Sequence, residues 1–203
     1  MICSTSAIVL NYKKFSDTSL ICNLYSKDCG KLSIIAKGAL SLKNPNSAIL
    51  QPFNHIDLIY YYKIRRNIQL LKEASIVNTH YDIPNNYKKI LYAFIISDIV
   101  NFSSYNDSPC KIIFRLINKS LESINDSQEQ FLTYYYIFFI IQLLIYLGYY
   151  PLLDKCYNCN GSIDAANFDE LSGQLICSKC TKKNLTINQD SILLMKYLFI
   201  QVI

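Results

Sequence analysis

Short runs of β-branched and aromatic residues, several of them alternating apolar with polar positions, occupy the first 80 residues. They are SAIVLNY (6–12), SLICNLYS (19–26), KLSIIAKG (31–38), FNHIDLIYYYK (53–63) and IQLLKEAS (68–75), and each has the length and composition of a strand. KDCG (27–30) is a hairpin signal, because Gly30 can adopt a positive φ. Five strands, interrupted only by the link from Ala39 to Pro52, predict a small closed sheet, for which the oligonucleotide-binding (OB) barrel is the best-known five-stranded arrangement.

From Asn85 onward the apolar residues recur with a helical period. Helices are predicted over residues 85–102, over 109–124 with Pro109 at its start, and over 127–150, where Gly148 and Pro151 end the pattern. A last helical pattern begins in LTINQDSILLMKYLFIQVI, which runs to Ile203. The predicted fold class is therefore α+β, with an OB-fold domain in residues 1–80 followed by an all-α helical domain in residues 81–203.

Four cysteines interrupt the helical domain in the stretch CYNCNGSIDAANFDELSGQLICSKC (156–180). Two Cys-x-x-Cys pairs stand 17 residues apart, which is the spacing of a structural zinc site, and its ligands would be Cys156, Cys159, Cys177 and Cys180. Gly161 and Gly173 are expected to supply the turns of such an element. Because four thiolates fill a tetrahedral shell, we predict a structural Zn²⁺ site with no open position for a substrate.

The compartment decides between zinc and the other uses of paired cysteines. The chain opens MICSTSAIVLNYKK, without the basic region, apolar core and cleavage site of a secretory signal, so we expect a cytoplasmic protein. Disulfides are rare in that reducing compartment, and a thioredoxin-like redox motif would be a single pair beside a βαβ unit. Both alternatives are therefore disfavoured.

A membrane helix is the alternative for the uncharged stretch from Phe131 to Leu153, which is long enough to span a bilayer. Thr133, Gln142 and six tyrosines through Tyr150 speak against it, as does the cysteine pair that follows. A helix that is apolar all round can instead be the centre of a bundle, and this is the interpretation we favour.

Charge is distributed unevenly along the chain. The net charge is +5, but residues 1–80 hold ten Lys and Arg against four acids, a net of +6, which leaves −1 for the rest. A basic barrel with aromatic residues on its strands is typical of single-stranded nucleic-acid binding. The candidate DNA-binding residues lie on the predicted strands or in their loops: Lys13, Lys14, Lys37, Lys43, Lys63, Arg65, Arg66, Tyr12 and Tyr25. Any one of these tyrosines can equally be a packing residue, and any one lysine a solvated one.

No catalytic constellation is present, so we expect a protein that is not an enzyme. The histidines, His55 and His80, are expected to be ordinary surface or core residues. Lys111, Arg115 and Lys119 recur every four residues and form one basic stripe on the second predicted helix, which is either a solvated face or a site for an acidic peptide.

The order of these parts resembles one known family. YKKFSDTSLICNLYSKDCGKLSIIAKGA (12–39), LQPFNHIDLIYYYK (50–63) and LLKEASIV (70–77) resemble the amino-terminal domain of RecO, a bacterial DNA repair and recombination mediator. LLIYLGYYPLLDKCYNCNG (143–161) is similar to the helix end and the entry to the zinc element of the same family.

The resemblance implies an OB barrel that binds and anneals single- and double-stranded DNA. It also implies a complex with RecR that helps to load RecA onto DNA coated by single-strand-binding protein. The helical domain would receive the acidic, Phe-ended tail of that coating protein, and the stripe Lys111, Arg115 and Lys119 is our candidate for this role.

The sequence departs from the family in two places. The dense basic run that commonly follows the third strand is here ALSLKN, with Lys43 alone, so weaker DNA binding through this loop is expected. The chain also stops within its last helical pattern, where relatives usually continue, and reduced core burial or a smaller partner surface would follow. A zinc-ribbon RNA-binding or ribosome-associated module is the alternative, because it shares the basic barrel and the four cysteines.

Overall fold

The computed structural model describes residues 1–41, 44–103, 111–149, 152–181 and 186–200 of the chain. These form two compact units, Met1–Phe139 and Ile140–Ile203. The predicted domain boundary at residue 80 stays a prediction. The first unit extends beyond it and includes helices that follow the barrel in the sequence.

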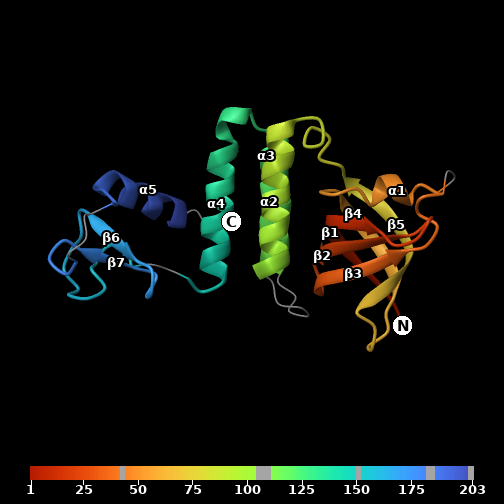
Figure 1. Ribbon diagram of the computed structural model, residues 1–203, viewed down its shortest axis with the longest axis horizontal. Helices are drawn as coiled ribbons and strands as arrows, with labels where there is room; N and C mark the ends of the chain where they lie inside the picture. Colours follow the sequence, from red (N-terminus) through yellow and green to blue (C-terminus); the bar gives the residue numbers. More distant parts are fainter. Residues whose placement is uncertain (42–43, 104–110, 150–151, 182–185, 201–203) are drawn as a thin grey trace. The chain divides into compact units, whose positions relative to one another are not determined.

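Five strands form a closed barrel in the first unit (Figure 1). They are β1 (Ile2–Lys14), β2 (Leu20–Ser26), β3 (Gly30–Ala36), β4 (His55–Tyr61) and β5 (Ile68–Asn78), in the order β1-β2-β3-β5-β4. The pair of β3 and β5 is parallel and the other pairs are antiparallel. A four-residue helix, α1 (Asn46–Ile49), lies in the link between β3 and β4. The predicted small closed sheet of five strands is confirmed, and its boundaries differ from the predicted ones by a few residues.

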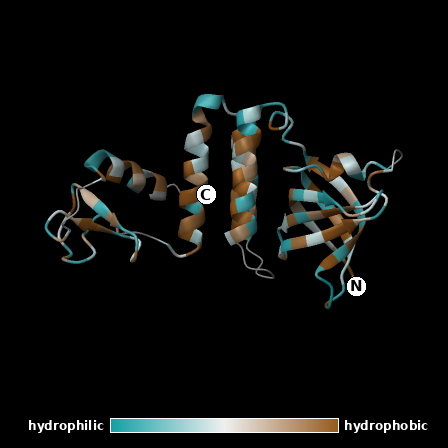
Figure 2. Ribbon diagram, viewed as in Figure 1, coloured by the Kyte–Doolittle hydropathy of each residue, from teal (hydrophilic) through white to brown (hydrophobic). Residues whose placement is uncertain are grey.

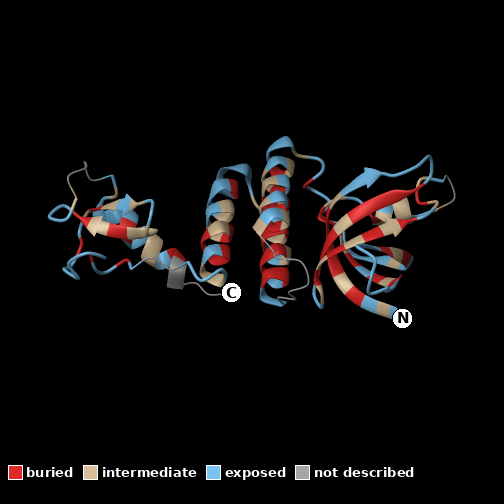
Figure 3. Cartoon of the chain, turned by 60° about the horizontal axis from the view of Figure 1, so that its bottom comes forward, coloured by how far each residue is buried: buried red, intermediate tan, exposed pale blue. Residues whose placement is uncertain are grey.

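Alternation along the strands builds the core of the barrel. Leu20, Cys22 and Leu24 of β2 point inward, as do Leu32, Ile34 and Ala36 of β3, and each is at most 9% exposed. Gly30 begins β3 with a φ of +67°, which is the conformation that the hairpin turn requires. In Figures 2 and 3 apolar and buried positions follow the strands through the barrel.

Two helices cover one outer side of the barrel. They are α2 (Tyr87–Ser103) and α3 (Lys111–Asp126), and both contact β1. Ile8 and Leu10 lie between the inward residues of β1, yet each is at most 1% exposed, because the helices pack over them. The ring of Phe53 meets that of Phe94 in α2 at 4.8 Å, edge to face, so the cover is fixed by aromatic packing as well.

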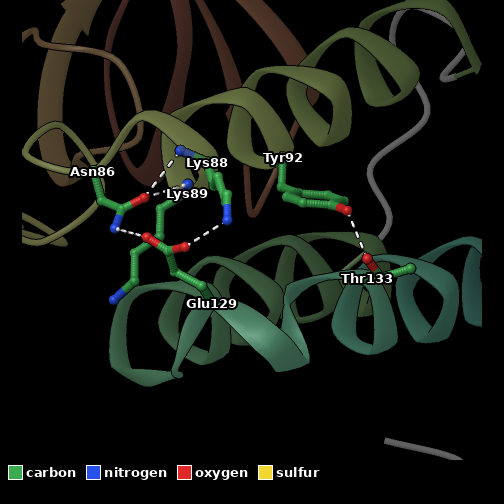
Figure 4. Close-up of polar contacts among 6 residues, drawn as sticks. All are labelled: Asn86, Lys88, Lys89, Tyr92, Glu129 and Thr133. Atoms are coloured by element: carbon green, nitrogen blue, oxygen red, sulfur yellow. Dashed lines mark hydrogen bonds and ion pairs between the residues drawn. The ribbon is translucent and has the colours of Figure 1, made fainter.

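Polar contacts join the start of α2 to the element that precedes α4 (Leu132–Tyr146) (Figure 4). The side-chain oxygen of Asn86 accepts hydrogen bonds from the backbone N–H groups of Lys88 and Lys89, at 2.9 and 3.1 Å, and so caps the helix. Its amide nitrogen donates to Glu129, at 2.9 Å, and Lys88 pairs with the same carboxylate at 2.7 Å. Asn86 therefore both starts α2 and ties it to the 3₁₀ turn η1 (Glu129–Phe131).

The second unit contains a β-hairpin and the last helix. The hairpin consists of β6 (Ala166–Asp169) and β7 (Gln174–Cys177), and the helix is α5 (Gln189–Ile200). Within this unit the buried Gln142 donates a hydrogen bond to the carbonyl of Leu198, at 3.1 Å.

The uncharged stretch from Phe131 to Leu153 is mostly occupied by α4, which has 15 residues. Within the described ranges, no helix is both long enough and apolar enough to traverse a bilayer. Gly148 follows α4 with a φ of +85°, in agreement with its predicted role at the helix end, whereas Pro109 and Pro151 lie outside the described residues.

Candidate metal centre and nucleic-acid interface

The first Cys-x-x-Cys pair lies in a tight turn that the backbone closes. Cys156 donates its N–H to the carbonyl of Gly161, at 2.8 Å, and its own carbonyl accepts from Asn160, at 2.9 Å. Asn160, with a φ of +55°, is the residue in the left-handed conformation, whereas Gly161 is not, so the expectation that Gly161 supplies this turn was wrong. Asparagine tolerates that conformation, which is why the sequence pattern pointed to the wrong neighbour.

The second pair begins at the end of the β6–β7 hairpin. Gly173 makes the hairpin turn with a φ of +68°, as predicted, and its N–H donates to Asp169 at 2.8 Å. Cys177 is the last residue of β7, and its carbonyl accepts from the N–H of Cys180 at 3.0 Å. The hairpin thus places the second cysteine pair next to the first.

The four thiol sulfurs all lie within 4.8 Å of one another. The sulfurs of Cys159 and Cys177, which are 3.7 Å apart, have the separation of two corners of a zinc tetrahedron, since Zn–S bonds of about 2.3 Å place the corners about 3.8 Å apart. The structure therefore confirms that the predicted ligands form one group that could hold a metal ion.

Thiolate formation is favoured at one of these cysteines. Burial opposes the charge of Cys156, but the backbone N–H groups of Cys177, Cys159 and Asn158 outweigh it and lower the pKa of this thiol to about 6. A hydrogen bond with Cys159 raises the pKa of the Cys180 thiol to about 12. Neighbouring thiols thus resist becoming thiolates together, and a cation held by this group would favour the ionised form of all four.

One group of candidate DNA-binding residues lies at one end of the β1-β2-β3 side. Lys13 and Lys14 end β1, where Lys14 pairs with Leu20, and Leu20 in turn pairs with Ala36, the residue before Lys37. All three lysines are exposed. Lys43 lies outside the described residues.

The second group lies in the loop between β4 and β5. Lys63, Arg65 and Arg66 are exposed there. The start of β5 pairs with β3, Ile68 with Ser33, so this loop lies toward the opposite end of β3 from Lys37. The two basic groups therefore flank the strands β2 and β3 from both ends, which is where the loops of OB barrels contact oligonucleotides.

The two candidate aromatic residues differ in accessibility. Tyr12 is 38% exposed and can present its ring to a base. Tyr25 is 1% exposed and pairs across the strands with the buried Ile8, so we leave it out of the proposed interface.

A groove over β2 and β3, beside the second basic group, could not be recognised in the sequence. It has a volume of about 370 Å³, and its lining includes Asn23, Lys31, Ser33, Arg66 and Asn67. The side chain of Ser33 donates to Asn23 at 2.8 Å, and the ammonium group of Lys31 donates to the carbonyl of Asn101, at the end of α2. Asn23 and Ser33 are polar residues on β2 and β3, and the sequence does not show that they line a groove. Only the fold brings the end of α2 and the β4–β5 loop beside them.

A different outer face of the barrel is acidic. Asp28, Asp57 and Glu73 line a groove of about 470 Å³ over β1, β4 and β5, together with several serines. The hydroxyls of Ser6 and Thr5 donate to Asp57 and Asp28. Three of the four acids among residues 1–80 thus lie together, on a face that repels a polyanion.

The predicted basic stripe is on the surface of α3. Lys111, Arg115 and Lys119 are all exposed. Of the apolar residues beside them, Ile113, Leu116 and Ile117 are at most 8% exposed and belong to the core, whereas Ile112 is 39% exposed. Ile112 is therefore the apolar neighbour that a bound peptide would meet.

The histidines are packing residues in this fold. His80 is 1% exposed and its Nδ1 donates to the carbonyl of Phe53, at 2.8 Å. The ring of His55 lies edge to face with that of Phe114, at 5.5 Å. Burial lowers the pKa of both rings and favours their neutral form.

A closed five-stranded barrel, a helical cover and a separate four-cysteine element define a two-part α+β protein with a candidate metal centre. Residues 1–80 match the family model described as Recombination protein O N terminal, and residues 84–200 match Recombination protein O C terminal. The chain therefore belongs to the RecO family.

Several relatives named DNA repair protein RecO are similar to this chain. The protein of Chlorobaculum parvum is 30% identical over 175 residues, which are 84% of this chain and 67% of the relative. That of Pelodictyon phaeoclathratiforme is 31% identical over 156 residues, 77% of this chain and 59% of the relative, and that of Mesoplasma florum is 29% identical over 179 residues, 87% and 66%. The chain thus spans about two thirds or less of the length of these relatives.

Proposed function

We propose that this chain acts in DNA repair and homologous recombination as a mediator that binds and anneals DNA. With RecR, it would help to load RecA onto single strands coated by single-strand-binding protein. The relatives that are named DNA repair proteins support this proposal. The observation that carries it is the pair of exposed basic groups that flank β2 and β3 of the barrel, opposed by an acidic face elsewhere on the same barrel.

Binding by these groups is sequence-independent. Lysine and arginine side chains neutralise phosphates and release the counterions condensed on them, whatever the base sequence. Bases can stack on the exposed ring of Tyr12 or enter the groove beside Lys31. That groove is lined by side-chain amides and hydroxyls. A protein that binds the phosphate backbone of DNA can hold two complementary strands. Because it neutralises their phosphates, it reduces the repulsion between the strands and so favours their annealing.

The metal centre has a structural role in this proposal. Cys156, Cys159, Cys177 and Cys180 would hold a Zn²⁺ ion, as the 3.7 Å spacing and the four-thiol donor set support. When it is bound, the ion supplies cross-linking of two turns rather than chemistry. The cysteines hold the hairpin against the first turn and thereby order the polar segment around them.

The stripe on α3 is our candidate for the acidic tail of single-strand-binding protein. Lys111, Arg115 and Lys119 would pair with its carboxylates, and the exposed Ile112 would contact its apolar end. Arg115→Glu should weaken binding of a tail peptide, whereas Lys72→Glu on β5 should not. Unchanged peptide affinity in Arg115→Glu would refute this assignment.

Binding to a fluorescent single-stranded oligonucleotide over a salt series tests the DNA-binding proposal. Six described cations form the two groups, so the slope of log affinity against log salt should reach about −4 if all of them contact phosphates, and about −2 if one group does. The larger slope corresponds to an affinity loss of about 300-fold between 50 and 200 mM salt. Competition with RNA of the same sequence belongs to the experiment, and a preference for RNA, or no binding by folded protein at low salt, would overturn the proposal.

A further inference from the structure

A buried glutamine lies beneath the basic loop between β4 and β5. Gln69, the second residue of β5, is 4% exposed. Its side-chain oxygen accepts a hydrogen bond from the backbone N–H of Lys63, at 2.8 Å. Its amide nitrogen donates to the carbonyls of Lys63 and Arg66, at 3.2 and 2.6 Å. A single side chain therefore binds the backbone at both ends of the turn that carries three cations.

The backbone of the loop closes the same turn. The N–H of Arg66 donates to the carbonyl of Lys63, at 3.0 Å, and the N–H of Tyr62 donates to the carbonyl of Met1, at 2.8 Å. The carbonyl of Lys63 thus has two donors, one of them from Gln69. A buried amide that lost its partners would destabilise the barrel end, so the loop and Gln69 constrain each other.

The cations of this loop, in contrast, are free to bind a ligand. In the part of the chain that the structure describes, the side chains of Lys63, Arg65 and Arg66 form no ion pair or hydrogen bond with protein groups. Their backbone is fixed and their charged ends face solvent. This is the arrangement of a preorganised phosphate contact, in which little loop entropy is lost upon binding.

We infer that Gln69 is a positioning residue for DNA binding, which holds the loop of Lys63, Arg65 and Arg66 in the conformation that meets the phosphates. The inference rests on the proposed DNA-binding function. It assigns a role to a residue that carries no charge and is only 4% exposed, and that a search for basic or aromatic residues therefore misses.

The variant Gln69→Met tests the inference, because methionine is unbranched and similar in length but makes none of the three hydrogen bonds. Its affinity for a single-stranded oligonucleotide should fall about tenfold, because the backbone of the loosened loop must then be ordered upon binding. The salt slope should stay at the wild-type value, because no charge is removed. Gln51→Met is the matched control, since Gln51 also donates to a backbone carbonyl, that of Ser47 at 2.6 Å, but outside the basic loop.

Trypsin supplies a readout of the loop itself in the folded protein. Cleavage after Lys63, Arg65 and Arg66 should accelerate in Gln69→Met, while cleavage after Lys13 stays at the wild-type rate. Should Gln69→Met fail to fold, Gln69→Asn replaces it, because asparagine keeps a neutral amide but is one methylene too short to bond both ends of the turn. Wild-type affinity in the folded variant, or an affinity loss without faster cleavage of the loop, overturns the inference.

The triple variant Lys63→Ala, Arg65→Ala and Arg66→Ala separates this inference from the proposed function. If it loses affinity and salt slope while Gln69→Met binds normally, the loop contacts DNA and the role of Gln69 is refuted. If the triple variant itself binds like the wild type, the loop is not part of the interface, and both the proposed interface and the inference fail at that point.

Discussion

Cys177→Ser should release the metal and destabilise the second unit while leaving the barrel folded. The cysteine element buries few large apolar side chains of its own: within residues 152–181 they are Leu153, Ile163 and Leu175, each at most 7% exposed. At about 1.5–3 kcal/mol each, these contribute roughly 5–9 kcal/mol. Ligation of zinc by a complete site contributes about 10–16 kcal/mol. The metal is therefore the larger of the two contributions, and the element should not stay ordered without it.

Four measurements on purified protein check this reasoning: zinc content per chain, thermal unfolding, protease cleavage and DNA affinity. The variant should retain well under one zinc per chain and should be cleaved faster by protease between residues 152 and 181. Its affinity for DNA should stay close to that of the wild type, because the proposed DNA contacts lie on the barrel. Cys3→Ser is the control, since Cys3 packs against the barrel core and lies outside the metal group, and it should keep its zinc. A Cys177→Ser protein with wild-type zinc content and wild-type melting would refute the argument.

Three further outcomes follow from the first unit. Burial lowers the pKa of His80 below its ordinary 6.5, so the unfolded chain binds this proton more tightly than the folded protein does. The stability that the neutral ring contributes is therefore fully present above pH 6.5 and is lost as the pH falls below it. Urea unfolding at pH 7.5 and 5.5 should show a smaller loss of stability in His80→Gln than in the wild type, and equal losses would contradict the assignment. Asn86→Ala removes the cap of α2 and should lower the free energy of unfolding by about 1 kcal/mol, and with it the melting temperature. Lys88→Ala should lower the melting temperature less, since its ion pair with Glu129 is open to solvent. The reverse order of the two melting temperatures would be inconsistent with the cap. Glu73→Lys, on the acidic face, should leave the affinity for a short oligonucleotide nearly unchanged, and a large gain measured by fluorescence anisotropy would mean that DNA passes over that face.

The barrel and the metal centre could be predicted because each depends on local patterns. Alternation along β2 and β3 puts Leu24 and Ile34 on the apolar faces of their strands, which are the faces that the barrel buries, and a one-residue shift of register would move every side chain to the other face. The metal ligands followed from spacing, since a Cys-x-x-Cys turn brings its two sulfurs together wherever the rest of the chain lies. Neither inference needed knowledge of distant contacts.

The rest could not be predicted, because it depends on which elements meet. Tyr25 alternates with core residues of β2, a pattern that predicts an outward and accessible ring, but in the fold it is only 1% exposed. In the sequence Gln69 looks like an ordinary polar residue of a strand, and only the fold shows that its side-chain amide makes three hydrogen bonds to the loop. Lys31 likewise acquired a place in a groove through the end of α2, which is 70 residues away in the sequence.

The surroundings of the barrel restrict where a nucleic acid can lie. The helical cover buries the outward side of β1 at Ile8 and Leu10, and carboxylates occupy the outer face over β1, β4 and β5. The polar groove at β2 and β3, by contrast, is lined by no acidic side chain among the described residues, and Arg66 of the second basic group lines it. That groove, of about 370 Å³, is small, whereas the cations of the two basic groups are exposed, so phosphate contacts should dominate the affinity and base contacts should add little discrimination. The proposed mediator function, which requires binding to any sequence, is consistent with this balance.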